Sequence, residues 1–138
     1  MIKFFVPGTP APQGSKKAFK RGKKIVLVEM SEKLPAWRDA VSRVASDHAP
    51  DEPLDCALRV SMDFYLPTPA KTRFGKHPAG VPDLDKLARA VNDGITAGKL
   101  WTDDSRVCSL HVRKHWATDT PGVRITVEPL WERLRNAL

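Results

Sequence analysis

Residues 55–66, D-C-A-L-R-V-S-M-D-F-Y-L, alternate between apolar and more polar side chains, and this alternation decides the fold class. The apolar positions fall on every second residue, at Cys56, Leu58, Val60, Met62, Phe64 and Leu66. A period of two places successive side chains on opposite faces of a strand. We therefore predict a strand over residues 55–66 that buries one of its faces.

Two helices and several shorter strands are predicted on either side of this strand. Apolar residues recur at helical spacing from about Glu32 to His48 and from about Leu84 to Ala97, and the expected N-caps are Ser31 and Asp83. Further strands are expected over residues 1–6, 25–28, 107–116 and 123–128. The order β-β-α-β-α-β-β predicts one α+β domain over residues 1–138, in which a small mixed sheet of about five strands is flanked by two main helices.

The composition excludes several classes of protein. The hydrophobic fraction is 41% and the charged fraction 28%, both close to globular averages, so the chain can bury a core. It contains no run of 18 apolar residues and no signal-peptide pattern at its start, so we expect no membrane partner. Two cysteines, Cys56 and Cys108, do not make a disulfide scaffold, and a cytoplasmic location is the default expectation.

The positive charge is concentrated in two loops rich in proline and glycine. The net charge is +7, and the first 28 residues contain seven basic residues and no acid, so the remainder of the chain is neutral. The basic residues of the predicted loops 7–24 and 67–82 are Lys16, Lys17, Lys20, Arg21, Lys23 and Lys24, and Lys71, Arg73 and Lys76. Such loops are typical of contacts with nucleic acid, although a solubilising role is the alternative.

Acidic residues stand close to these basic loops. Asp83 and Asp85 open the second predicted helix, and Asp103 and Asp104 form a pair before a predicted strand. Neighbouring carboxylates repel one another unless a cation lies between them, and Mg²⁺ is the hard cation that takes carboxylate oxygens and retains water. A Mg²⁺ site acting on a phosphodiester is one interpretation. The alternative is that these residues are only helix caps, ion-pair partners and turn residues.

Residues 82–107, P-D-L-D-K-L-A-R-A-V-N-D-G-I-T-A-G-K-L-W-T-D-D-S-R-V, resemble the signature of the RusA family of Holliday-junction resolvases. That pattern is D-x-D-[NK]-L, a helix with a further Asp, and then an aromatic residue and D-D before a strand. The segment P-G-T-P-A-P-Q-G-S-K over residues 7–16 resembles the opening loop of many members. The resemblance implies a RusA-like fold and a homodimeric endodeoxyribonuclease that depends on Mg²⁺, with Mn²⁺ as a substitute, and needs no small-molecule cofactor. Such an enzyme cuts four-way DNA junctions by paired symmetric nicks in recombination and repair.

The resemblance also implies roles for individual residues. The family's metal-binding acids fall on Asp83, Asp85 and Asp104, with Asp103 as the adjacent acid. The family's catalytic lysine falls on Arg89, which can clamp a phosphate but is a poor proton donor, and Lys86 is the alternative cation.

The family's mid-helix acid falls on Asp93. A structural ion pair with Arg89, four residues before it, is our preferred interpretation of that acid.

The expected helix separates the acids. Residues 83–97 advance by about 21 Å as a helix, and the seven residues from Ala97 to Asp104 span about 23 Å when fully extended. Three alternatives remain: the chain runs straight back along the helix, the helix ends early near Gly94, or Asp104 serves a site partly built by a second subunit.

Other interpretations are weaker. Cys108, His111 and His115 suggest a zinc site, but the strand period places both histidines on the face opposite Cys108, and both cysteines are expected in the core. Trp37 and Trp101 are expected to pack inside the protein.

Two rival functions remain. One is a restriction-type metal nuclease, for which Asp104-Ser105-Arg106 is a weak match, and the other is a DNA-binding module without activity.

Overall fold

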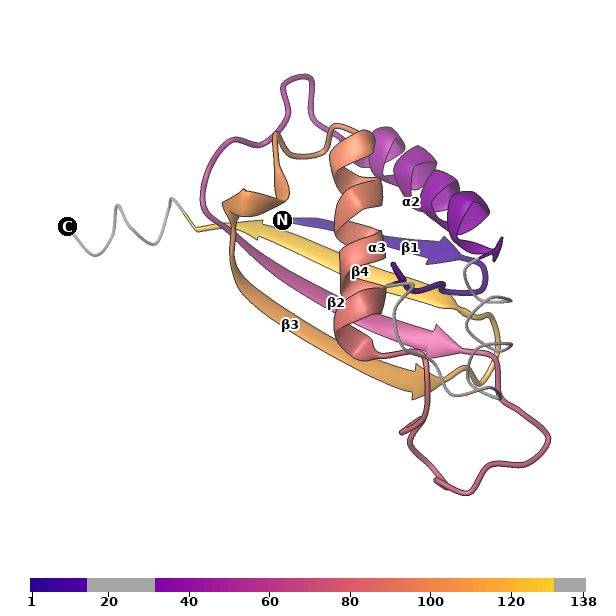
Figure 1. The fold of residues 1–138 in the computed structure, drawn as a ribbon. Helices are drawn as coiled ribbons and strands as arrows, with labels where there is room; N and C mark the ends of the chain where they lie inside the picture. The colour runs from indigo at the N-terminus through magenta and orange to yellow at the C-terminus, as the bar shows by residue number, and fades with distance from the viewer. Residues whose placement is uncertain (15–31, 131–138) are drawn as a thin grey trace.

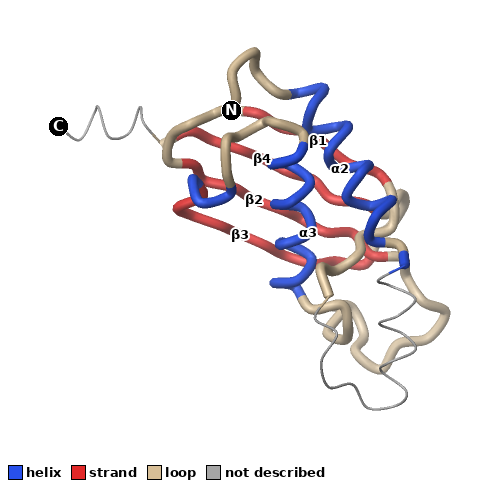
Figure 2. Tube along the Cα trace, turned by 45° about the horizontal axis from the view of Figure 1, so that its top comes forward, coloured by secondary structure: helices blue, strands red, loops and turns tan. Residues whose placement is uncertain are grey.

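The computed structural model describes residues 1–14 and 32–130, and in this part of the chain two helices cover one face of a four-stranded sheet (Figures 1 and 2). The elements in chain order are β1 (Ile2–Pro7), α2 (Leu34–His48), β2 (Leu58–Leu66), α3 (Leu84–Ala97), the 3-10 turn η1 (Asp104–Arg106), β3 (Val107–Trp116) and β4 (Gly122–Pro129). The α+β class with two main helices is therefore confirmed. The fifth predicted strand, over residues 25–28, lies outside the described residues.

The sheet is mixed, and β2 lies inside it. The strand order is β1-β4-β2-β3, where β2 pairs parallel with β3 and antiparallel with β4, and β4 pairs antiparallel with β1. Although β3 and β4 are consecutive in the chain, the connection between them crosses β2. Within the described chain β3 has a neighbouring strand on one side only, which makes it an edge of the sheet.

The alternation over residues 55–66 buries the face that the sequence predicts. Inward residues of β2 pack against the helices, and outward residues lie on the uncovered face. The strand begins three residues later than predicted, because the chain before it makes a different contact. Leu54 forms an isolated bridge with Trp101, and its backbone bonds to Leu100 and Thr102.

The helices pack together through small residues. The bounds of α3 match the prediction, and the helix continues past Gly94. That glycine lies where α3 packs against α2. A Cβ at Gly94 would stand 2.7 Å from Val41 Cγ1, so the missing side chain allows the close approach. Helix α2 begins at Leu34 with Lys33 as its N-cap, two residues later than predicted, and Ser31 lies outside the described residues.

The single core contains both tryptophans that were expected there, Trp37 and Trp101. Cys56 packs against this core, but the prediction for Cys108 was wrong. A shift in the pairing of β2 with β3 inserts Cys108 as an extra residue, and a bulge of this kind turns its side chain out to solvent. In the ranges that the structure describes, we find no helix with the length and apolar character needed to cross a membrane.

Candidate metal and DNA site

Two exposed carboxylates stand at the N-terminal end of α3. Asp83 is the N-cap residue, as predicted, but its side chain makes no capping hydrogen bond and is 54% exposed. Asp85 lies in the first turn and is also exposed. The N-terminal end of a helix carries a partial positive charge, which stabilises acids there. Both side chains are exposed and thus accessible to an external cation.

Lys86 forms an ion pair with one of these acids. Its Nζ atom lies 3.4 Å from Asp83 Oδ2, and its side chain is 24% exposed. The backbone carbonyl of Lys86 accepts a hydrogen bond of 3.0 Å from the N–H of Gln13. The described start of the first basic loop is thus attached to the first turn of α3. The basic residues of that loop, Lys16 to Lys24, lie outside the described residues.

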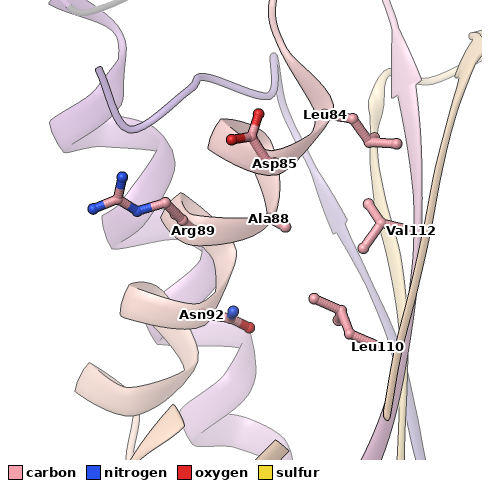
Figure 3. Close-up of a pocket in the computed structure, with 7 residues that line it drawn as sticks. All are labelled: Leu84, Asp85, Ala88, Arg89, Asn92, Leu110 and Val112. Carbon is pink, nitrogen blue, oxygen red and sulfur yellow. The ribbon is translucent and has the colours of Figure 1, made fainter. Parts of the chain in front are cut away.

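Arg89 lies one turn further along α3 and points away from β3 (Figure 3). It is exposed, and it does not form the expected pair with Asp93. Asp93 instead approaches Arg38 on α2, with 3.9 Å between Arg38 Nη1 and Asp93 Oδ2. The mid-helix acid thus makes a contact between helices, and Arg89 is exposed to solvent.

The second basic loop, residues 67–82, joins β2 to α3 and therefore leads directly to the acids (Figure 1). Lys71, Arg73 and Lys76 are all exposed on it. Its end is attached to β3, where Lys114 Nζ donates hydrogen bonds to the carbonyls of Gly80 (2.7 Å) and Pro82 (2.9 Å).

Lys114 was not among the candidate residues from the sequence. Burial lowers the pKa of the Lys114 ammonium, although the negative charge of Asp83 opposes this shift. The signal that could have found it is a lysine at an inward position of β3, between Val112 and Trp116.

The second acidic pair lies in η1. The Asp103 carboxylate caps this turn and accepts a bond of 2.9 Å from the N–H of Ser105, and hydrogen bonds from Ser105 lower the pKa of Asp103. Asp104 is the first residue of the turn and is exposed. Of the two acids, Asp104 is therefore the one whose carboxylate is available to a ligand.

Two anchors hold η1 against the rest of the molecule. The Arg106 Nε atom lies 2.7 Å from Asp55 Oδ1, and the Thr102 hydroxyl donates to the same oxygen at 3.1 Å. Trp101 is buried, and its Nε1 donates to the Thr96 hydroxyl at 2.7 Å. These contacts fix the loop that carries Asp104 next to the C-terminal end of α3.

The two acidic groups lie at opposite ends of α3 (Figure 1). A helix of 14 residues is about 21 Å long. Over the described residues, no group of three or more His, Cys, Asp or Glu side chains is placed to hold a metal ion. The structure therefore does not bring Asp83, Asp85 and Asp104 together within one subunit, nor does it form the zinc site considered from Cys108 and the histidines.

An apolar groove runs between α3 and the edge strand β3 (Figure 3). Its volume is about 590 Å³, and it is lined by Leu84, Asp85, Ala88, Arg89, Asn92, Leu110 and Val112. Leu110 is 43% exposed, which is high for a large apolar side chain. The Oδ1 atom of Asn92 is buried and has no hydrogen-bond partner. The groove thus combines exposed apolar surface with an unsatisfied acceptor.

Comparison with known proteins gives a family match. A family model described as "Endodeoxyribonuclease RusA" matches residues 7–128, which include both basic loops, α3 and η1. A search of curated proteins gave no match.

Proposed function

The chain belongs to the RusA family of endodeoxyribonucleases, and on this basis we propose that it is a Mg²⁺-dependent nuclease that resolves four-way DNA junctions by paired nicks during recombination and repair. The observation that carries the proposal is the pair of exposed carboxylates, Asp83 and Asp85, directly after a basic loop at the positive end of α3. Basic loops attract the DNA backbone, and the acids provide the oxygen ligands that a hard cation requires.

Asp83 and Asp85 would hold the metal, since both are exposed and their donor atoms are carboxylate oxygens. Bound Mg²⁺ supplies an activated water and stabilises negative charge on the phosphodiester. Lys86 lies beside Asp83 and limits the repulsion between the two acids before a cation binds. Arg89 presents its guanidinium to solvent one turn away, where it is available to clamp a phosphate oxygen.

We further propose that a second copy of the chain supplies Asp104 to this site. The edge strand β3 runs from η1, which carries Asp104, to the end where Lys114 contacts Pro82 beside Asp83. If two copies of β3 pair antiparallel about a two-fold axis, the start of each strand lies beside the end of the other. The apolar groove and Leu110 lie along this edge, so the same contact would cover them.

Mixed dimers of inactive variants test this arrangement. Asp85→Asn and Asp104→Asn should each be inactive alone. After joint refolding, half of the dimers at a random mixture should contain one of each chain. Such a dimer keeps one intact site, made of Asp83 and Asp85 from one chain and Asp104 from the other, so it should nick one strand of a junction.

The matched control is a mixture of Asp83→Asn with Asp85→Asn, in which both sites of a mixed dimer carry a defect and no activity should return. If the mixture of Asp85→Asn with Asp104→Asn shows no nicking of the junction, the proposal of a shared site is overturned. Wild-type protein with Mg²⁺ should cut a four-way junction but not a linear duplex. Cutting of the duplex would favour a restriction-type nuclease, and binding without cutting would favour an inactive DNA-binding module.

A further inference from the structure

An inward-facing lysine interrupts the apolar face of β3. Leu110, Val112, Lys114 and Trp116 pair with four inward residues of β2, and Lys114 lies opposite Phe64. Placing an ammonium group in such surroundings costs free energy unless hydrogen bonds replace its lost water. The position therefore needs a specific reason for a lysine rather than another apolar residue.

The contacts of Lys114 supply that reason. Its Nζ atom donates to the carbonyl oxygens of Gly80 at 2.7 Å and of Pro82 at 2.9 Å. Bonds from a charged donor are about twice as strong as neutral ones. The chain over residues 80–83 belongs to neither a helix nor a strand, so it lacks the regular backbone hydrogen bonds of such an element. The two bonds from Lys114 attach this segment to the sheet.

The attached segment leads directly into the acids. Pro82 precedes Asp83, whose own carbonyl accepts the first helical bond of α3 from the N–H of Leu87 at 3.1 Å. The hydrogen bond from Lys114 to the carbonyl of Pro82 thus fixes the backbone directly before the N-cap residue of α3. The backbone that leads into Asp83 and the start of α3 is therefore held against β3.

We propose that Lys114 is a positioning residue for the metal site, acting through the backbone carbonyls of Gly80 and Pro82. This inference rests on the proposed function, because it concerns the site formed by Asp83 and Asp85. Lys114 acts on the backbone and does not itself contact metal or substrate. Residues that orient metal ligands typically change metal affinity by 10- to 100-fold when they are replaced.

Mn²⁺ binding to the full chain, followed by the loss of the free-Mn²⁺ electron paramagnetic resonance signal, tests the inference without any cleavage. We expect Lys114→Met to weaken Mn²⁺ binding by about 10-fold or more. Lys114→Arg keeps a charged donor that can serve two carbonyls, and it should restore binding to within about 3-fold of wild type. If Lys114→Met does not fold, Lys114→Gln, which retains a neutral donor, replaces it with an intermediate loss expected.

Arg113→Met is the matched control, because Arg113 is the adjacent residue of the same strand but lies on the opposite face and is 70% exposed. It removes the same charge and should leave Mn²⁺ affinity unchanged. Equal affinity of wild type and Lys114→Met would overturn the inference, as would an equal loss in Arg113→Met. If wild-type protein binds Mn²⁺ no better than Asp83→Asn does, the proposed metal site itself fails, and the two failures are thereby distinguished.

Discussion

Asp83 caps the N-terminal end of α3, whereas Asp104 opens the short turn that follows the other end of the same helix. The helix is continuous from Leu84 to Ala97, so the distance between the two acids is set by its length and not by a mobile loop. A ligand set that includes both residues would therefore need the second chain proposed above. The direction of β3 provides a simple solution, because this strand connects the two acidic ends along an open edge of the sheet.

The two neighbouring acids of η1 should differ in their effect on activity. We expect Asp104→Asn to reduce junction cleavage by about 100-fold or more, since its exposed carboxylate is the proposed metal ligand. Asp103→Asn should keep cleavage within about 10-fold, because Asp103 is engaged as the cap of the turn and asparagine also caps well.

Single-turnover cleavage of a four-way junction measures the activity of both variants, and a band-shift assay in EDTA verifies that they still bind. Removing negative charge near a phosphate does not weaken attraction, so binding should persist. Loss of activity in Asp103→Asn equal to that in Asp104→Asn would contradict the assignment of the cap.

Lys86 and Arg89 should divide the role of the single lysine found in the family's pattern. Lys86→Ala and Arg89→Ala should both slow the single-turnover rate more than they weaken junction binding, because Lys86 pairs with Asp83 and Arg89 is exposed one turn after Asp85 on α3. Arg89→Lys should retain activity, since it keeps a mobile positive charge at the same exposed position.

The outcome is informative in both directions. If both alanine variants cut at the wild-type rate, neither residue stabilises the transition state, and the cations of the loop over residues 67–82 become the next candidates. Thermal unfolding of each variant shows whether a slower rate reflects a folding defect, for which Lys86, the less exposed of the two, is the more sensitive position.

The loop over residues 67–82 should contribute to DNA affinity through its charge alone. Each cation that neutralises a phosphate changes the slope of log affinity against log salt by about 0.9. Replacing Lys71 and Lys76 by alanine should therefore flatten the slope by up to roughly 2 units per subunit, and by similar amounts for junction and duplex. Fluorescence anisotropy with labelled DNA at several salt concentrations gives this slope.

A variant with alanine at Lys3 and Arg43 is the matched control, because both residues are exposed on other elements and the net charge falls by the same amount. Its slope should remain that of wild type. The same experiment on Lys16, Lys17, Lys20 and Arg21 examines the first basic loop, for which we expect a change of roughly 2 to 4 units. An unchanged slope would mean that the loop only solubilises the protein.

Local patterns in the sequence predicted the elements better than their arrangement. The bounds of α3 were predictable to the residue, because its apolar stripe, its N-cap at Asp83 and its length agree with one another. The order of the strands was not, since β3 and β4 are adjacent in the chain yet separated by β2 in the sheet. Strand pairing depends on distant contacts that hydrophobic periodicity does not specify.

The same holds for the candidate site: the sequence suggested which residues belong to it better than how they are arranged. The resemblance supplied the candidate acids, but the helix length left three arrangements of Asp104 open, and the structure places Asp104 beyond the far end of α3 from Asp83. The role of Lys114 depends on a loop returning over β3, and the exposure of Cys108 depends on a bulge, so neither follows from a regular alternation of residues. Sequence periodicity predicts the direction of a side chain only where the hydrogen-bond ladder between strands is regular. Cys108 lies at an irregularity of that ladder, and Lys114 is contacted by a loop.

A polar cluster on the uncovered face of the sheet should make stability depend on pH. The Asp63 carboxylate is only 16% exposed and accepts hydrogen bonds from His115 Nε2 at 2.9 Å and from Arg113 Nε at 2.8 Å. Burial raises the pKa of Asp63, but these hydrogen bonds and positive charges together outweigh burial and hold the pKa below its ordinary value of 3.8. The cluster therefore stabilises the fold when Asp63 is ionised.

The sign follows from the direction of that pKa change. A carboxyl whose pKa is lower in the folded state contributes its full stability above the unfolded pKa, and this contribution is lost as pH falls from about 4 through the folded pKa. Asp63→Asn should lower the free energy of unfolding by about 1 kcal/mol at pH 7, a modest value because Arg113 is largely exposed to solvent. The difference between wild type and variant should therefore shrink as pH falls below about 4.

Urea unfolding of both proteins between pH 7 and pH 3 measures this difference directly. Asp119→Asn, at an exposed position in the connection before β4, is the matched control and should change stability by less than about 0.5 kcal/mol at every pH. A difference between wild type and Asp63→Asn that stays constant down to pH 3 would show that the carboxylate charge does not stabilise the cluster. The loss of stability in Asp63→Asn would then come from packing or hydrogen bonds that do not depend on the ionisation of Asp63.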